Sequence, residues 1–519
     1  MRGSKLIILL IFLTVFSGVI LAERDQEFHP YWVFFHDKEV ADASNFDPAE
    51  FEFPHLSERA LARRAIRGTN PGPTFHDLDV SANYIDDIIV GDVKVRVVSR
   101  WLNAISILAQ QSYIDELEAN SIVKKTRRIH RMSKKMVKRI TREDVEYYTD
   151  ADYGASYRQN EQINAVAAHT AGYTGMDVWL LMLDTGYYTD HQAFQAERII
   201  AEFDFIQGDS TTQNEFGDAG NQHNHGTATA SAAGGFIEGS LRGVAYDCKL
   251  LLAKTEIVTE EIQAEEDHYV AALEWGEAAG ADVASSSLGY LDWYTYPDMN
   301  GETAVTTNGV DLAVSMGMVC VTAAGNEGND DWYYIIAPAD ADSVISVGAV
   351  DSLNNIASFS SHGPTYDGRI KPEVLAQGVA TFAAGTASDG SFISANGTSL
   401  STPLVAGAAA LILQANPNWT PMMVREALMM TADGNSTPNN TRGFGLVDVM
   451  AAIDYDFGIV MGDVSEDGEL DVNDAVLMLE WVLNGTEITE IQFNTADVND
   501  DNQVNILDIV VLVDWIINL

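Results

Sequence analysis

The chain has 519 residues, with 76 acidic against 30 basic side chains and a formal net charge of −46 at pH 7. This length exceeds what one hydrophobic core usually organises and predicts about two to four domains. The acidic balance argues against nucleic acid and anionic membranes as partners, because both would repel the chain.

The first 22 residues have the pattern of a secretory signal peptide. Arg2 and Lys5 precede the apolar run LIILLIFLTVF, and small residues lead to Ala22. The run is too short for a membrane span and ends in a cleavage-like stretch. We expect no later segment to be apolar for long enough to cross a bilayer. The expected location is therefore outside the cell, either free or at the cell surface.

Residues 23–150 predict a small α+β domain. YWVFFHD and VKVRVVSRWLNAISILA are strand-like, whereas SERALARRAIRG and SYIDELEANS are helix-like. The basic stretch KKTRRIHRMSKKMVKR follows. It is interpreted as an exposed linker, or as a processing region between two parts that later separate.

Residues 151–457 alternate strand-like and helix-like segments. DVWLLMLD, KLLLAKT, DVASSSLG and MGMVCVTAAGN indicate strands, and HYVAALEWGEAAG, VTTNGVDLAVSMG and the residues after Ser399 indicate helices. This alternation predicts an α/β fold, a parallel sheet flanked by helices, with reactive residues at the carboxyl ends of the strands. Cys248 and Cys320 fall in expected buried strands, so we predict two separate thiols.

Four polar residues lie where such a sheet would gather them. Asp184 ends one strand, His225 lies in HNHGTATASAAGG, Asn326 follows VCVTAAG, and Ser399 precedes an apolar helix that contains Pro403. Each has an ordinary explanation when taken alone, such as a helix cap, a metal ligand or a turn. Together they supply a nucleophile, a base, an orienting acid and an oxyanion donor.

Four motifs make the chain similar to one family. LDTG at 183–186, HGT at 225–227, AAGNEG at 323–328 and GTSLSTP at 397–403, with acid, histidine and serine in that order, resemble the subtilisin-like serine proteases, or subtilases. The resemblance implies a serine endopeptidase with a subtilisin-like fold, whose catalytic residues are Asp184, His225, Ser399 and the oxyanion donor Asn326. It implies no catalytic metal or organic cofactor, and structural calcium.

The segment SSSLG at 285–289 resembles the family's substrate-pairing strand. By that resemblance Ser287, Leu288 and Gly289 contact the substrate peptide. Three departures from the family pattern stand out: Ala228 stands where HGT is usually followed by histidine, Ala-Gln-Gly at 376–378 replaces a common Ala-Pro-Gly, and Tyr290 stands at a frequent glycine of the pocket wall. The shape of the pocket is therefore left open.

The resemblance extends to the first domain, which is similar to a subtilase propeptide. Such a domain assists folding and inhibits the enzyme until it is cleaved off. We expect self-cleavage between about residues 130 and 160, and docking of the basic tail on the acidic catalytic part. The chain's own propeptide and protein or peptide substrates are thus its expected partners.

Residues 458–519 contain a repeat at an offset of 34. GDVSEDGELDVNDAVLMLEWVLN aligns with ADVNDDNQVNILDIVVLVDWIIN, and each copy places oxygen-bearing side chains at EF-hand spacing. Gly468 suits the sharp turn of the first loop, and Asn502 tolerates the same left-handed turn in the second. The candidate calcium ligands are Asp463, Ser465, Asp467, Glu469, Asp471 and Asp474, then Asp497, Asn499, Asp501, Gln503, Asn505 and Asp508.

Aspartate at the last loop position, with one helix after each loop, resembles a type I dockerin. A dockerin implies a cohesin partner, but the Ser-Thr recognition pair is replaced by Val472-Asn473 and Ile506-Leu507. A calcium-stabilised anchor or sorting element is the alternative. Two interpretations of the whole chain compete with an active protease. In one, the chain is an inactive homologue that binds peptides. In the other, the dockerin-like module is the main functional part, and the protease is a passenger in a surface assembly.

Overall fold

The computed structural model describes residues 27–40, 43–129, 131–132, 150–259, 261–458, 461–465, 470–486, 488, 490–499 and 501–518. The expected signal peptide, half of the basic stretch, and Asp467 and Glu469 lie outside these residues. The chain divides into two compact units, residues 1–453 and 454–519.

The first unit begins with a four-stranded antiparallel sheet in the order β2-β3-β1-β4. Its core contains Val33, Ile105 and Ile107, all without solvent exposure. The elements of this domain are β1 (Phe28–Phe35), α2 (Glu58–Arg67), α3 (Ala82–Ile88), β2 (Lys94–Ser99), β3 (Ala104–Gln110), α4 (Gln111–Leu117) and β4 (Val123–Arg128).

Two predictions for this domain need correction. The single strand-like run at 93–109 is two strands, because Asn103 takes a left-handed φ of 47° in the turn between them. The basic stretch does not begin as a linker: its first residues form β4, an edge strand paired with β1. Charged side chains are common on edge strands, where they discourage pairing with other chains.

A seven-stranded parallel sheet follows, in the order β15-β14-β13-β12-β6-β10-β7. The middle residues of its central strands are mostly apolar and almost without exposure, as a sheet covered on both faces requires. The strands are β6 (Trp179–Asp184), β7 (Ile199–Asp204), β10 (Lys249–Lys254), β12 (Val283–Ser286), β13 (Val319–Ala323), β14 (Ile345–Val350) and β15 (Val374–Gln377).

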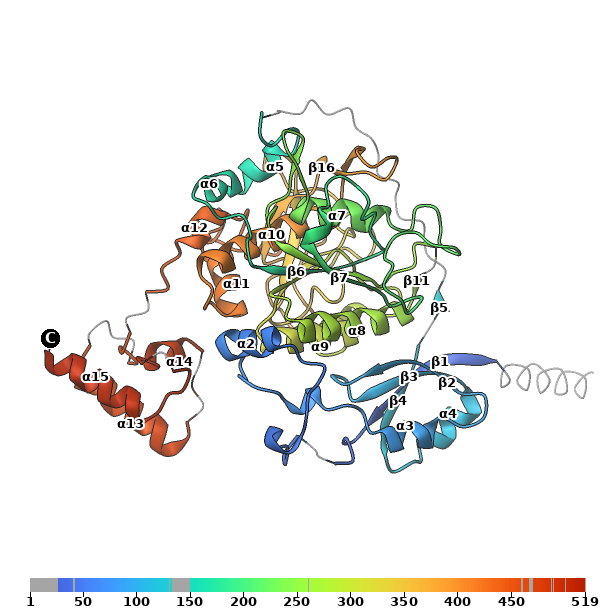
Figure 1. Cartoon of the computed structure of the whole chain (residues 1–519), viewed down its shortest axis with the longest axis horizontal. Helices are drawn as coiled ribbons and strands as arrows, with labels where there is room; N and C mark the ends of the chain where they lie inside the picture. Colours follow the sequence, from blue (N-terminus) through green and yellow to red (C-terminus); the bar gives the residue numbers. More distant parts are fainter. Residues whose placement is uncertain are drawn as a thin grey trace, which may run out of the picture. The chain divides into compact units, whose positions relative to one another are not determined.

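Helices and three short two-stranded sheets surround this sheet (Figure 1). The helices are α5 (Tyr157–Gln162), α6 (Ala165–Thr170), α7 (Asn224–Gly234), α8 (Ala264–Ala279), α9 (Val305–Ser315), α10 (Thr398–Ala415), α11 (Pro421–Met430) and α12 (Val449–Ile453). The short pairs are β5 (Arg131–Met132) with β11 (Glu261–Ile262), β8 (Phe236–Ile237) with β9 (Leu241–Arg242), and β16 (Thr381–Ala384) with β17 (Phe392–Ala395). The predicted α/β fold is confirmed.

The helix α10 is the apolar centre of this α/β domain. Contrary to the sequence-based expectation, it is long and apolar enough to span a membrane, the one such helix among the described residues. However, 89% of it is buried inside the domain, as in the core helix of a globular fold. Cys248 and Cys320 are free, buried thiols, as predicted, and burial raises the pKa of Cys248 to about 12.

The N-terminal domain rests on two helices of the catalytic part. Strand β2 and helix α2 both pack against α8, and Figure 1 shows the sheet β1–β4 beside α8 and α9. After β4 the chain adds Arg131 and Met132 as a strand to β11 of the catalytic part.

The second unit is a small helical domain with α13 (Val472–Asn484), α14 (Glu490–Ala496) and α15 (Ile506–Asn518). Met478 and Leu512 are fully buried where α13 and α15 pack together, with Trp481 beside them. The repeat thus gives one helix after each predicted loop, and α14 connects the two copies.

Candidate active site

Asp184 and His225 meet at the carboxyl end of the central strand β6. Asp184 is 1% exposed, and its Oδ1 lies 2.7 Å from Nδ1 of His225 at the start of α7. The same carboxylate accepts hydrogen bonds from the Thr185 amide at 2.7 Å and the Thr229 hydroxyl at 2.9 Å. The Thr185 and Thr229 hydrogen bonds fix the carboxylate of Asp184, and its contact with His225 orients the imidazole with Nδ1 toward the acid.

The approach of α7 to β6 depends on Gly226. A Cβ added there would stand 2.2 Å from the Gly186 carbonyl oxygen and 3.0 Å from the Asp184 Cβ. Only glycine fits this contact, so the small residue after His225 is a condition for the pair to form. The imidazole remains 29% exposed on its outer side.

Ser399 is the second residue of α10, after the N-cap Gly397. Pro403, four residues on, has no N–H to donate to the Ser399 carbonyl. The hydroxyl of Ser287 donates to that carbonyl instead, at 2.8 Å. Ser287 therefore completes the helix at the point where proline interrupts it.

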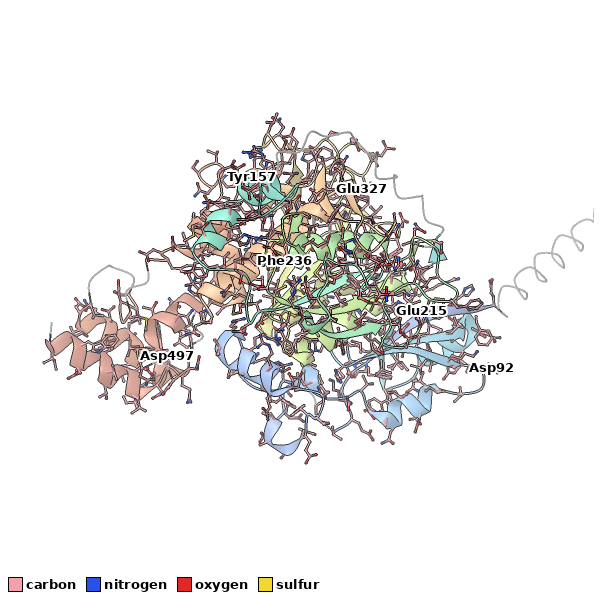
Figure 2. The ribbon with its side chains drawn as sticks, turned by 45° about the horizontal axis from the view of Figure 1, so that its top comes forward. Asp92, Tyr157, Glu215, Phe236, Glu327 and Asp497 are labelled. Atoms are coloured by element: carbon pink, nitrogen blue, oxygen red, sulfur yellow. The ribbon has the colours of Figure 1, made fainter. Side chains whose placement is uncertain are left out.

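Asn326 lies beside the start of α10, after strand β13; Figure 2 labels its neighbour Glu327. Its Oδ1 accepts from the Thr398 amide at 2.9 Å and the Thr398 hydroxyl at 3.1 Å. With the oxygen held twice, the amide NH₂ is oriented as a donor. Gly397 has a φ of +149°, and a Cβ there would lie 2.7 Å from Ser399 Oγ and 3.7 Å from Asn326 Oδ1. Serine and asparagine therefore border the same small space.

The three expected substrate-contacting residues follow β12, the strand between β6 and β13. Ser287 is buried, whereas Leu288 and Gly289 are half-buried. Tyr290 turns into the core with 1% exposure, and its hydroxyl donates to Glu256 at 2.6 Å. Its side chain therefore does not wall an exposed pocket. The Ile336 side chain packs closely against this segment, since a Cβ added to Gly289 would lie 2.3 Å from Ile336 Cδ1.

The described residues contain two groups of carboxylates that could hold a metal ion. One is Asp204, Asp209 and Glu215 in the catalytic part, with oxygens within 4.8 Å of one another. Lys254 Nζ lies 2.7 Å from Asp204 Oδ2, so an ammonium already balances part of this charge. The second group belongs to the C-terminal repeat.

That second group is Asp497, Asp501 and Asp508, again with oxygens within 4.8 Å of one another (Asp497 is labelled in Figure 2). Asn502 has the predicted left-handed φ, 58°. The Asn499 Oδ1 is buried without a hydrogen bond, which leaves an oxygen available to a cation. Burial, with Asp508 and Asp501 nearby, raises the pKa of Asp497.

In both loops, backbone amides donate to the last aspartate of the loop. The Ser465 and Asp471 amides donate to Asp474 at 3.0 and 2.9 Å, and the Asn499 and Asn505 amides donate to Asp508 at 3.3 and 2.8 Å. Gln503 is exposed in the second loop. The predicted ligands Asp467 and Glu469 lie outside the described residues.

Sequence reasoning missed the residues that hold the catalytic ones. Thr229 was detectable, because it lies four residues after His225 and therefore on the same face of α7. Thr398 belongs to the GTSLSTP motif, but the motif alone does not indicate that this residue orients Asn326. Pro403 indicates that the Ser399 carbonyl needs a donor other than a backbone N–H. The sequence does not show that Ser287 supplies this donor, because Ser287 lies 112 positions from Ser399.

Three family models match the chain: a peptidase S8 propeptide domain of Bacteroidota at residues 30–145, the subtilase family at 175–445, and the dockerin type I domain at 461–516. Subtilisin E of Bacillus subtilis (strain 168) is 35% identical over 310 residues, 59% of this chain and 72% of that protein. Subtilisin of Bacillus pumilus is 35% identical over 294 residues, 56% of this chain and 96% of that protein.

A crystal structure of MycP1 with the N-terminal propeptide removed aligns with a TM-score of 0.48 at 23% identity, over 58% of this chain and 97% of that one. The matched models and the subtilisin relatives confirm the family inferred from the sequence motifs. The chain therefore belongs to the subtilase family of serine-type endopeptidases, with a subtilase propeptide domain before the catalytic domain and a type I dockerin domain after it.

Proposed function

We propose that the chain is an exported endopeptidase in which Ser399, His225 and Asp184 hydrolyse peptide bonds. The observation that carries this proposal is the 2.7 Å contact between Asp184 and His225 Nδ1, which leaves Nε2 to act on Ser399. As Ser399 Oγ attacks the scissile carbonyl, Nε2 takes its proton and later gives it to the leaving amine. Asp184 stays charged and stabilises the imidazolium.

Asn326 and the Ser399 N–H would bind the oxyanion that forms on the attacked carbonyl. The Asn326 oxygen is engaged by Thr398, so its amide hydrogens need no rotation when the charge develops. A donor of this kind contributes roughly 10²- to 10³-fold to the rate. Leu288 and Gly289, with the backbone at Ser287, would pair with the substrate peptide beside this point.

The enzyme would be made as a zymogen that cleaves itself. The proposed boundaries are a signal peptide at 1–22, a propeptide at 23–150, a catalytic domain at 151–457 and a dockerin domain at 458–519. The cleavage site would lie between about residues 130 and 160. The propeptide would inhibit the enzyme until it is removed.

Calcium would be the structural cofactor of the dockerin loops, bound by the ligands named from the repeat. The convergent carboxylates at Asp497, Asp501 and Asp508 and the unpaired Asn499 oxygen fit a hard cation that takes six to eight oxygens. Calcium would neutralise these acids and thereby stabilise the fold of this domain. Chelation should therefore unfold residues 458–519 while the catalytic domain keeps its α/β signal in circular dichroism.

A cohesin-like protein would be the partner of the dockerin domain. Val472 and Ile506, which occupy the first recognition position of each copy, are 63% and 55% exposed. An apolar surface in place of hydroxyls would select a partner with a matching apolar face. Binding to cohesins in calcium, lost on chelation, would support this assignment.

The test of the catalytic proposal compares residues 23–519 with the Ser399→Ala variant, both produced in calcium. On denaturing gels the unmodified chain should lose its first domain and digest a casein substrate, while the variant should stay full length and inert. N-terminal sequencing would locate the cleavage. If both chains fold but remain full length and inactive, the protein is a peptide-binding homologue and the proposal is wrong.

A further inference from the structure

The propeptide domain carries an additional helix that touches the catalytic domain far from the active site. Helix α2, residues Glu58–Arg67, is inserted between β1 and α3 and packs against α8. Four arginines at 59, 63, 64 and 67 follow helical spacing, so they project from one side of α2. Each of them donates a hydrogen bond to α8 or to a neighbouring segment of the catalytic domain.

Arg63 and Arg64 converge on one carboxylate of α8, Glu277. Arg63 Nη2 pairs with Glu277 Oε1, while Arg64 donates through Nε at 2.8 Å and through Nη2 at 2.6 Å. All three side chains are at most 2% exposed. Arg64 also pairs with Asp77 of the propeptide at 2.6 Å, which fixes its orientation. A buried charge network of this kind is strongly unfavourable when one partner is missing.

Arg59 and Arg67 converge on a second carboxylate, Asp282. Arg59 Nη2 pairs with Oδ2, and Arg67 Nη1 donates to Oδ1 at 2.9 Å. Both arginines also donate to backbone carbonyls of the catalytic domain, Gly280 at 3.0 Å for Arg59 and Pro417 at 2.7 Å for Arg67. Arg59 further stacks over the Trp179 ring at 4.5 Å. Five guanidinium donors make arginine suited to such combined recognition.

This contact lies at the amino ends of the strands, whereas the catalytic residues lie at their carboxyl ends. Trp179 begins β6 and Asp184 ends it; Asp282 precedes β12 and Ser287 follows it. A strand of this length spans roughly 17–20 Å. Helix α2 therefore cannot act as a substrate mimic, and its hold on the enzyme is independent of what enters the active site.

We propose that Glu277, Asp282 and the neighbouring carbonyls form a separate docking surface for an arginine-bearing helix. In this chain its occupant is α2, and the surface keeps the propeptide on the enzyme after the connection between the two domains is cut. The proposal rests on the function proposed above, because retention matters only if the propeptide is cleaved. Since the central pairs are buried, salt weakens them less than it would weaken docking by an exposed basic tail.

The experiment uses the full chain with Ser399→Ala and a recognition site for an unrelated, site-specific protease inserted after residue 140. Cutting by the added protease does not depend on the chain's own activity, so failure here is distinguishable from failure of the proposed catalysis. The variant is Arg59→Ala with Arg67→Ala. The matched control is Lys94→Ala with Lys124→Ala, which removes two positive charges from exposed positions of the same domain. The dissociation constant of the cut propeptide is measured in each, at low and high salt.

We expect the arginine variant to bind at least about tenfold more weakly than the lysine control, with only a small effect of salt on the unmodified pair. Equal constants for the arginine and lysine variants would overturn the proposal. Thermal unfolding of the uncut chains checks folding. If the double variant does not fold, Arg59→Ala alone replaces it, because that side chain is 34% exposed and donates its hydrogen bonds to the catalytic domain; a constant equal to the control again overturns the proposal.

Discussion

Two sets of buried carboxylates in the catalytic domain differ in where their partners come from. Asp184 receives all three of its hydrogen bonds from Thr185, Thr229 and His225 of its own domain. Glu274 and Glu277 on α8 are satisfied by Ser99, Arg63 and Arg64 of the propeptide. Asp184 therefore keeps its partners in the mature enzyme, whereas the second set is paired only while the propeptide stays bound.

The largest effect should come from Asp184→Asn. The amide keeps the shape of the side chain but would favour the wrong imidazole tautomer, so kcat should fall by about 10⁴-fold. Thr229→Val, which removes only one of the three donors, should cost far less, about tenfold or below. Steady-state hydrolysis of a chromogenic peptide by both variants checks this. Equal losses in the two would contradict the assignment of Asp184 as the orienting acid.

The next effect concerns the nucleophile's position. In Gly397→Ala the new methyl group would stand 2.7 Å from Ser399 Oγ, at a φ of +149° that side chains rarely adopt. A displacement of about 1 Å can cost roughly 100-fold in rate, and we expect at least that loss in kcat. Gly368→Ala is the control, because it has a φ of +97° but nothing within 4 Å. If both variants retain full activity, Ser399 is not the nucleophile.

The propeptide-facing acids should respond to pH. Burial raises the pKa of Glu274 from 4.5 to about 7, although Ser99 and Arg100 favour its charged form. Once the propeptide leaves, the pKa should return toward 4.5, so complex formation takes up a proton. The contribution of Glu274 to the complex is complete below pH 4.5 and is lost as the pH rises through 7.

The measurement compares the propeptide dissociation constant in chains with and without Glu274→Gln, both carrying Ser399→Ala. Their ratio should change by up to about tenfold per pH unit between pH 4.5 and 7, with the unmodified complex weakening as the pH rises. Asp267, with a pKa raised to about 7, and His268, lowered to about 4, titrate in both chains and cancel in the ratio. Glu302→Gln, at an exposed position, should leave the ratio flat.

The two regions also differ in how far the sequence predicts them. Asp184, Asn326 and Ser399 were identifiable because each lies beside a recognisable strand or helix within a short motif. The pairing of Arg63 and Arg64 with Glu277 was not, because they lie 214 and 213 positions before it in the chain. SERALARRAIRG was correctly predicted as a helix, but charged residues usually indicate a solvated face, and here Arg63 and Arg64 are buried. The same assumption turned the strand β4 into a predicted linker.

The smallest effect tests whether the oxyanion donor, like Asp184, depends only on its own domain. Thr398→Val keeps the side-chain shape and the backbone N–H but removes the hydroxyl that lies 3.1 Å from Asn326 Oδ1. The Asn326 amide then keeps one of two restraints, so kcat should fall severalfold, within about tenfold, with KM unchanged. Ser401→Ala removes a hydroxyl from the same helix without touching Asn326 and should be neutral. The comparison is made on mature enzyme freed of propeptide; a loss seen only in the uncut chain would mean that the propeptide, too, supports the active site.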